Sequence, residues 1–252
     1  MFNKVYFVTP MYNASYHLDS LYESLKEQSN PNWVWVILDD QSSDDSNERA
    51  SKIVDSDTLG RVMITRCSKN EKKFALKNLC DFLDGMRERG QVSKDMFDQD
   101  DYIVAVVDGD DELCNENTVE LILSEYNGNE KLDALWTAHT WDVNSLNISR
   151  ELPQKINTYQ YPWVSSHLKT FKLSVFENIS NENFKDLDGN WFKRGYDQAL
   201  YLPILYLARE HMYMNEICYL YRINSNSIQN REAKEKEQMD TVRLVRARGY
   251  VK

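Results

Sequence analysis

Short apolar segments alternate with amphipathic ones along the first half of the chain, and this order constrains the fold more than any other feature. The apolar segments are rich in β-branched and aromatic residues, which is typical of buried strands. They are KVYFVT (residues 4–9), WVWVILD (33–39), RVMIT (61–65) and YIVAVVD (102–108). The intervening segments carry apolar side chains at a spacing of three to four, which predicts helices over residues 15–28, 43–55 and 72–90. The alternation predicts an α/β fold with a mostly parallel, twisted sheet flanked by helices.

The second half of the chain lacks this regular alternation. Residues 128–228 are rich in Trp and Tyr, and no repeat or low-complexity linker separates them from the first half. We therefore expect one domain over residues 1–229, divided into a ligand-binding half (1–127) and a contiguous second half (128–229). Residues 230–252 are highly charged and predict a helical tail.

Length and charge limit the function classes. A chain of 252 residues with 42% hydrophobic content can bury a core of its own. Its net charge of -10 argues against general binding to the phosphates of a nucleic acid, so an anionic ligand would need a cation or a few placed basic side chains. The N-terminal segment does not resemble a signal peptide, and the longest apolar run, residues 199–208, is too short to span a bilayer. The expectation is a soluble, cytoplasmic protein.

Polar residues gather where the predicted strands end. Open parallel sheets bind ligands at the carboxyl ends of their strands. The residues at these ends are Thr9, Pro10 and Asn13 after the first strand, Asp39 and Asp40 after the second, and Arg66 after the third. The acidic pair after the second strand could hydrogen-bond a nucleobase or a ribose hydroxyl. The alternative is that these residues keep the strand end soluble and cap the following helix.

The fourth predicted strand ends in a cluster of carboxylates. Asp108 and Asp110 flank Gly109, which permits a tight turn with both carboxylates facing the same crevice. Mg²⁺ and Mn²⁺ prefer oxygen ligands and often combine one or two carboxylates with substrate phosphates. A metal site and a solvated turn both fit this segment, and Asp111 and Glu112 fit a role in shaping the turn.

Five segments resemble, in order and spacing, the motifs of the family 2 glycosyltransferases of the GT-A fold. VTPMYNASYHLDSLYESLKEQ resembles the first strand and helix of the family, ILDDQSSDDS its DDxS segment and VVDGDDEL its DxD motif. VSSHLKTFKLSVF and GYDQALYLPIL resemble the acceptor-side and catalytic-base segments of part of the family. The resemblance spans residues 5–226.

The resemblance implies a nucleotide-sugar-binding GT-A sheet continuous with an acceptor-side region. It implies an inverting hexosyl- or pentosyltransferase that depends on Mn²⁺ or Mg²⁺. The donor would be a nucleotide sugar, with UDP as the expected nucleotide, and the acceptor a hydroxyl group, with a saccharide as the default.

Individual donor-side roles follow from the same resemblance. Asp39 would contact the base of the nucleotide, and Thr9 and Pro10 would line its uridine pocket. Asp108 would lie near the ribose or the donor sugar and could share the metal, of which Asp110 would be the principal ligand. The remaining donor-side candidates are Asn13, Arg66, Lys73, Lys77, Asn78 and Gly109. An ordinary solvated face would also explain the basic residues.

On the acceptor side, Asp197 matches the catalytic base of inverting members. Such a carboxylate accepts the proton of the acceptor hydroxyl as its oxygen attacks the anomeric carbon. Many relatives carry Glu-Asp where this chain has Tyr196-Asp197, and an Asp near a helix N-terminus is also favoured by the helix dipole alone. Further acceptor-side candidates are His167, Trp163, Trp191 and Tyr196, for which burial is the alternative explanation.

Three other functions stay open at this stage. A haloacid-dehalogenase-type phosphohydrolase also uses a strand-end DxD, but its motif follows the first strand and continues to Thr or Val where this chain has Glu112. A binding module would hold a nucleotide or glycan without transfer. An acceptor hydroxyl on a modified nucleic-acid base would draw on the basic residues of the tail, although acidic residues accompany them.

Overall fold

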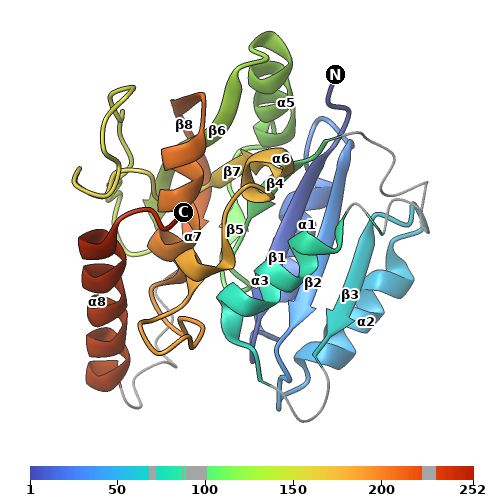
Figure 1. The fold of residues 1–252 in the computed structure, drawn as a ribbon. Helices are drawn as coiled ribbons and strands as arrows, with labels where there is room; N and C mark the ends of the chain where they lie inside the picture. Colours follow the sequence, from blue (N-terminus) through green and yellow to red (C-terminus); the bar gives the residue numbers. More distant parts are fainter. Residues whose placement is uncertain (68–71, 87, 89–100, 223–230) are drawn as a thin grey trace.

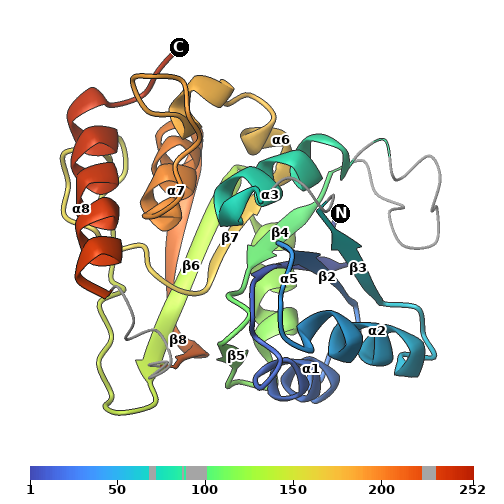
Figure 2. The ribbon, with the colours of Figure 1, turned by 90° about the horizontal axis from the view of Figure 1, so that it is seen from below.

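An eight-stranded sheet lies between two layers of helices (Figures 1 and 2). The computed structural model describes residues 1–67, 72–86, 88, 101–222 and 231–252. The strands are β1 (Val5–Met11), β2 (Trp33–Asp39), β3 (Val62–Arg66), β4 (Ile103–Val106), β5 (Glu112–Leu113), β6 (Leu132–Trp141), β7 (Lys169–Lys172) and β8 (Glu210–Tyr221). The helices are α1 (Leu18–Lys26), α2 (Ser46–Ser56), α3 (Phe74–Asp84), α5 (Thr118–Gly128), α6 (Leu173–Phe176), the 3-10 turn η1 (Asn181–Phe184), α7 (Tyr196–Leu207) and α8 (Arg231–Arg248).

The strand order across the sheet is β3-β2-β1-β4-β7-β6-β8-β5. The first four of these strands pair in parallel, as do β6 and β8, whereas β7 runs antiparallel to both β4 and β6. The short strand β5, which follows the acidic turn, pairs antiparallel with β8. The predicted mostly parallel α/β sheet is confirmed, and strands from both halves of the chain form it together.

Alternate residues of the central strands enter opposite hydrophobic layers, because successive side chains of a strand point to opposite faces. Tyr6 and Val8 of β1 belong to the cluster formed with α3, α6 and α7. Val5 and Phe7 belong to the cluster formed with α1, α2 and α5. Burial on both faces explains why the strand segments read as continuous apolar runs.

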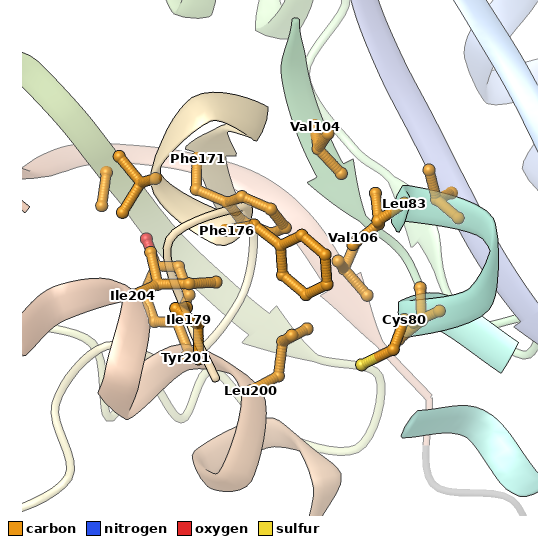
Figure 3. Packing of buried hydrophobic residues seen from close by; sticks show 14 of the residues in the cluster. Cys80, Leu83, Val104, Val106, Phe171, Phe176, Ile179, Leu200, Tyr201 and Ile204 are labelled. Carbon is orange, nitrogen blue, oxygen red and sulfur yellow. The ribbon is translucent and has the colours of Figure 1, made fainter. Parts of the chain in front are cut away.

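The first of these layers fixes α7 against the middle of the sheet. Figure 3 shows Cys80 of α3 and Leu200 of α7 extending toward Phe176, next to Val106 of β4 and Phe171 of β7. All five residues are at most 2% exposed. Interiors are packed as densely as organic crystals, so this contact holds the start of α7 in a defined place relative to the end of β4.

The predicted helices of the first half form close to the expected bounds, and the end of the third, at residues 87 and 89–90, lies outside the described residues. The predicted tail forms α8, and its residue 230 also lies outside. The long strands β6 and β8 were not predicted as strands. Their pairing contains register shifts on either side of Ala138, which break the two-residue period that identifies a strand. No helix within the described residues is long and apolar enough to cross a membrane.

Candidate active site

The acidic turn after β4 lies beside the first turn of α7. Tyr196, the first residue of α7, donates a hydrogen bond from its hydroxyl to Asp108 Oδ1. The backbone N–H of Asp108 donates to the hydroxyl of Tyr219 in β8 over 3.1 Å. These partners come from the second half of the chain, so the two predicted halves meet at Asp108.

The surroundings of Asp108 disfavour its charged form. Burial and the negative charge of Asp197 raise the pKa of Asp108 to about 7, although the ammonium of Lys169 opposes this shift. A cation beside a carboxyl group favours the ionised form instead. The turn is therefore suited to holding a positive charge.

Asp111 connects the turn to the end of β8. Its side chain is 1% exposed and accepts a 2.7 Å hydrogen bond from the Tyr219 hydroxyl and another of 2.7 Å from the backbone N–H of Arg222. Burial and the neighbouring carboxylates raise its pKa to about 9. Glu112 forms a 2.7 Å ion pair with Arg222. Both contacts agree with the expected role of these two acidic residues in shaping the turn.

Asp110 differs from its neighbours, since no group within the described ranges donates a hydrogen bond to its carboxylate. Two half-buried carboxylates, Asp108 and Asp110, thus lie on one turn with oxygen atoms that no described residue occupies. Hard divalent cations select such oxygen donors. The donor set of this turn fits Mg²⁺ or Mn²⁺.

Asp197, the second residue of α7, lies close to Asp108. One ligand atom each of Asp108, His167 and Asp197 falls within 4.8 Å of the others, a spacing that could hold a metal ion. However, Lys169 Nζ lies 2.7 Å from Asp197 Oδ1 and 3.3 Å from His167 Nδ1. Its ammonium would repel a cation placed among these three groups, so the structure favours Asp108 and Asp110 over this cluster as the metal side of the site.

Lys169 also sets the protonation of its neighbours. Burial works to raise the pKa of Asp197, but the charge and hydrogen bond of Lys169, together with His167 and a backbone hydrogen bond, outweigh it, and the pKa lies below its ordinary value. Burial and the same ammonium lower the pKa of His167 well below its ordinary value. The imidazole is therefore neutral at pH 7, and it stacks on the ring of Tyr219 with centroids 4.7 Å apart. At neutral pH, Asp197 is an ionised carboxylate beside a fixed positive charge.

Lys169 was missed in the sequence. It lies in β7, and its side chain is only 2% exposed. The available signal was a lysine between apolar residues in the run LKTF. Lysines are almost never fully buried unless paired, but the pairing depends on α7, which follows 27 positions later. Tyr219, which joins Asp108 to Asp111, was missed for the same reason.

On the donor side, Asp39 ends β2 with its side chain fully buried. Its carboxylate accepts hydrogen bonds from the backbone of Ser42 at 2.9 Å and from Asn47 at 3.2 Å, and pairs with Arg66 at 3.1 Å. Two predicted donor-side residues are thus in direct contact. Arg66 and Asn78 also line a cavity of about 150 Å³ between β3 and α3.

Asp40 has a structural role in the described chain. Its carboxylate accepts hydrogen bonds from the backbone N–H groups of Lys73 and Phe74 at 2.8 and 3.0 Å, and from Asn78 Nδ2 at 3.0 Å. The two backbone N–H groups stand at the N-terminus of α3, where a helix offers its N–H groups no partner of its own. The acidic pair after β2 therefore divides: Asp39 pairs with Arg66, and Asp40 caps a helix.

The residues after β1 are largely engaged within the protein. Thr9 is fully buried, and its hydroxyl accepts a 2.9 Å hydrogen bond from the indole of Trp35. Asn13 accepts a 2.8 Å bond from the backbone of Ser43, which holds the two strand-end loops together. A Cβ on Gly109 would lie 3.4 to 3.5 Å from residues of this segment, including the carbonyl of Pro10, which is ordinary contact. The acidic turn therefore packs directly on the end of β1.

The remaining candidates lie around α3 and the segment before α7. Lys73 pairs with Asp81 at 2.8 Å, and Lys77 also contacts Asp81. The ammonium of Lys77 lies 4.9 Å from the ring centre of Trp191. Trp163 is half-buried against the core cluster. The structure thus joins Trp191 to α3, and it brings Tyr196, His167 and Asp197 together around Asp108.

The fold is that of the GT-A glycosyltransferases: a mostly parallel sheet, here with an acidic turn at a strand end and a carboxylate at the start of a facing helix. Residues 6–81 match the family described as Glycosyl transferase family 2. The chain is 24% identical over 241 residues to Glycosyltransferase GlyG of Streptococcus pneumoniae serotype 4 (strain ATCC BAA-334 / TIGR4), a match that covers 89% of this chain and 72% of GlyG.

Solved structures give the same fold at low identity. S. aureus TarS in complex with UDP-GlcNAc matches with a TM-score of 0.61 and 15% identity, over 88% of this chain and 59% of that one. Mannosyltransferase PcManGT from Pyrobaculum calidifontis, in complex with GDP-Man and Mn²⁺, matches with a TM-score of 0.61 and 13% identity, over 95% and 62%. This chain thus spans about three fifths of either solved chain. Taken together, the matches show the GT-A fold and support a glycosyltransferase whose residues 6–81 are similar to family 2.

Proposed function

We propose that this enzyme is an inverting glycosyltransferase that moves a sugar from a nucleotide sugar to a hydroxyl group of a saccharide, with Mn²⁺ or Mg²⁺ bound at Asp110 and Asp108. The observation that carries the proposal is the ionised Asp197 carboxylate, held by Lys169 next to Asp108. The base and the turn proposed to hold the metal belong to one site, where one group accepts the proton of the acceptor and the other supports the leaving diphosphate.

The donor is proposed to be a UDP-sugar. TarS and PcManGT bind UDP-GlcNAc and GDP-Man respectively, so the fold accepts more than one nucleotide. The cavity of about 150 Å³ at Arg66 is smaller than the roughly 300–1,000 Å³ of a complete small-molecule site. It suits one part of the donor, such as the base, and Asp39 pairs with Arg66 in its wall.

The chain's own residues divide the reaction. Asp197 accepts the proton of the acceptor hydroxyl as that oxygen attacks the anomeric carbon, and the bond from this carbon to the diphosphate breaks on the opposite face. Lys169 keeps Asp197 ionised and oriented. Tyr196 fixes Asp108, so the donor and the base keep a constant separation. The metal, when bound, offsets the negative charge that gathers on the leaving diphosphate.

The acceptor-side residues support a saccharide. His167 is neutral and could exchange hydrogen bonds with hydroxyl groups, and the half-buried rings of Trp163 and Trp191 offer apolar faces of the kind that pack on sugars. A nucleic-acid acceptor has less support, because two basic residues of the tail are already engaged: Arg246 and Arg248 donate to backbone carbonyls of the domain.

The test combines a donor screen with the variant Asp197→Asn. UDP, GDP, dTDP and CMP sugars are screened with Mn²⁺ for release of free nucleotide and for thermal stabilisation. In Asp197→Asn we expect transfer to fall at least 100-fold, because general-base catalysis contributes about 10²–10⁴-fold. Metal-dependent UDP binding, measured by calorimetry, should change less than about threefold. Full transfer activity in this variant would exclude Asp197 as the base.

A further inference from the structure

The C-terminal helix α8 packs on the start of the helix that carries Asp197. Figures 1 and 2 show α8 next to α7. Gly195, directly before α7, has a φ of 66°, and a Cβ there would lie 3.1 Å from the carbonyl oxygen of Gln238 and 3.3 Å from Thr241 in α8. The backbones of the two helices therefore meet two residues before Asp197, with no space for a side chain between them.

One guanidinium group of α8 reaches the residue after Asp197. Arg246 Nε donates a 2.7 Å hydrogen bond to Gln198 Oε1. Its Nη1 donates to the carbonyls of Tyr159 and Tyr161 at 3.0 and 2.7 Å. Arg246 thus ties the first turn of α7 to a separate segment of the acceptor-side half.

The end of α8 is also anchored to segments other than α7. Arg248 donates to the carbonyls of Lys185 and Asn183 at 2.8 and 3.1 Å, and Val245 is 2% exposed. The Asn183 side chain exchanges two 2.8 Å hydrogen bonds with the backbone of Val251. Arg246 is therefore presented to Gln198 from a fixed support.

We propose that Arg246 is a positioning residue for the base: through Gln198 it fixes the first turn of α7 and so the distance between the Asp197 carboxylate and the donor site at Asp108. This inference rests on the proposed role of Asp197. A displacement of about 1 Å of a catalytic group costs up to about 100-fold in rate. The donor-binding residues around Asp39 lie on other elements and do not depend on Arg246.

The experiment compares Arg246→Met, Gln198→Met and the double variant with Arg243→Met. Arg243 lies on the same helix and is exposed, and its guanidinium pairs only loosely, at 3.5 Å, with Asp240, so it is a matched control. Turnover is measured as release of nucleotide from the sugar nucleotide that the donor screen identifies. Donor KM, UDP affinity with Mn²⁺ and melting temperature are measured on the same samples.

In Arg246→Met we expect kcat to fall about 10- to 100-fold, with donor KM and UDP affinity within about twofold of the wild type. Gln198→Met should show the same split, and the double variant should lose no more than Arg246→Met, because Arg246→Met already removes the contact with Gln198. Arg243→Met should behave as the wild type.

Two results would overturn the inference. One is wild-type kcat in both Arg246→Met and Gln198→Met; the other is a loss of kcat matched by an equal loss of UDP affinity, which indicates general destabilisation. Asp197→Asn, measured alongside, separates the two proposals. If Asp197→Asn is inactive while Arg246→Met is fully active, only the positioning role fails. If Asp197→Asn retains activity, the proposed base itself fails.

Discussion

Asp108, Asp110 and Asp111 stand within four residues of one another, yet they have different surroundings. Asp108 is tied to α7 through Tyr196, and Asp111 is buried against β8, whereas the Asp110 carboxylate accepts no hydrogen bond from the described residues. A side chain without a hydrogen-bond partner in the described part of the chain is available to a ligand. The three carboxylates should therefore respond differently to the same substitution.

We expect Asp110→Asn to abolish the metal dependence of nucleotide binding. Calorimetry with UDP should give the same affinity in Mn²⁺ and in EDTA, whereas the wild type should bind about tenfold or more tightly in Mn²⁺. Asp111→Asn is the control: because burial keeps this carboxyl mostly protonated at pH 7, its amide should preserve the Mn²⁺ effect at a stability cost of about 1 kcal/mol. Loss of the Mn²⁺ effect in Asp111→Asn alone would contradict the assignment.

Lys169 gives a prediction about pH. With Lys169→Met, burial of Asp197 is no longer opposed by an ammonium, so the pKa of Asp197 rises. The base is then protonated up to a higher pH. We expect transfer at pH 7 to fall about 10-fold or more, the acidic limb of the kcat profile to move to higher pH, and part of the activity to return as the pH is raised.

Lys172 supplies the control for this experiment. It is buried in the same strand, but its ammonium pairs with Asp133, at 3.4 Å, and with the carbonyl of Glu130. Lys172→Met should lower stability without moving the acidic limb. If folded Lys169→Met keeps the acidic limb of the kcat profile at the wild-type pH, the ammonium does not set the protonation of Asp197.

At the scale of elements, the start of α7 is where helix geometry determines the site. Gly195 and Gly189 both adopt the left-handed region, with φ of 66° and 82°. A Cβ on Gly189 would meet nothing within 4 Å, whereas on Gly195 it would press on the backbone of α8. Alanine substitutions at these two glycines therefore distinguish the free-energy cost of backbone strain from the cost of displacing α8.

We expect Gly189→Ala to lower the free energy of unfolding by about 1–2 kcal/mol through strain alone. Gly195→Ala should lower it by a further 1–3 kcal/mol, because overpacking costs about that much. Urea unfolding of both variants measures the difference. If the two variants lose the same free energy of unfolding, α8 moves to accommodate the new methyl group at no energetic cost.

The elements differ in how far the sequence predicts them. Strands β1 to β4 and the helices between them follow from local patterns, because a strand buried on both faces must be apolar throughout. β6 and β8 could not be predicted, because buried polar side chains such as Asp133 and His139 interrupt their apolar pattern and bulges shift its period. Their polar residues are stabilised by partners distant in sequence, including Arg209 for Asp133.

The site follows the same division. Asp39, Asp108 and Asp110 could be predicted as candidates because they stand at strand ends in the regular half. The roles of Lys169 and Tyr219 could not, because a buried lysine or tyrosine is identified only by the partner that three-dimensional packing supplies. The same reasoning explains why Asp40 was indistinguishable from Asp39: only the fold shows that it caps α3.

At the scale of the whole molecule, some buried titratable groups make the folded protein more stable at low pH, and others make it more stable at high pH. Burial raises the pKa of Asp108 and Asp111, so these groups contribute stability at low pH that is lost as the pH rises. Burial lowers the pKa of His139 to about 4, and the charge of Lys169 adds to this shift. The unfolded chain takes up a proton on this histidine near pH 6.5, so its contribution to stability is lost as the pH falls.

His139→Asn isolates one of these opposing contributions. At pH 7.5 we expect the variant to be about 1–3 kcal/mol less stable than the wild type, because His139 is buried and its Nδ1 lies 3.1 Å from the Ser149 hydroxyl. As the pH falls from 6.5 toward 4, the gap should narrow, since only the wild-type unfolded state gains the histidine proton. Urea unfolding of both proteins between pH 5 and 7.5 measures it. A gap that stays constant over this range would mean that His139 titrates equally in the folded and unfolded chain, and that the interior beneath the active site is open to protons.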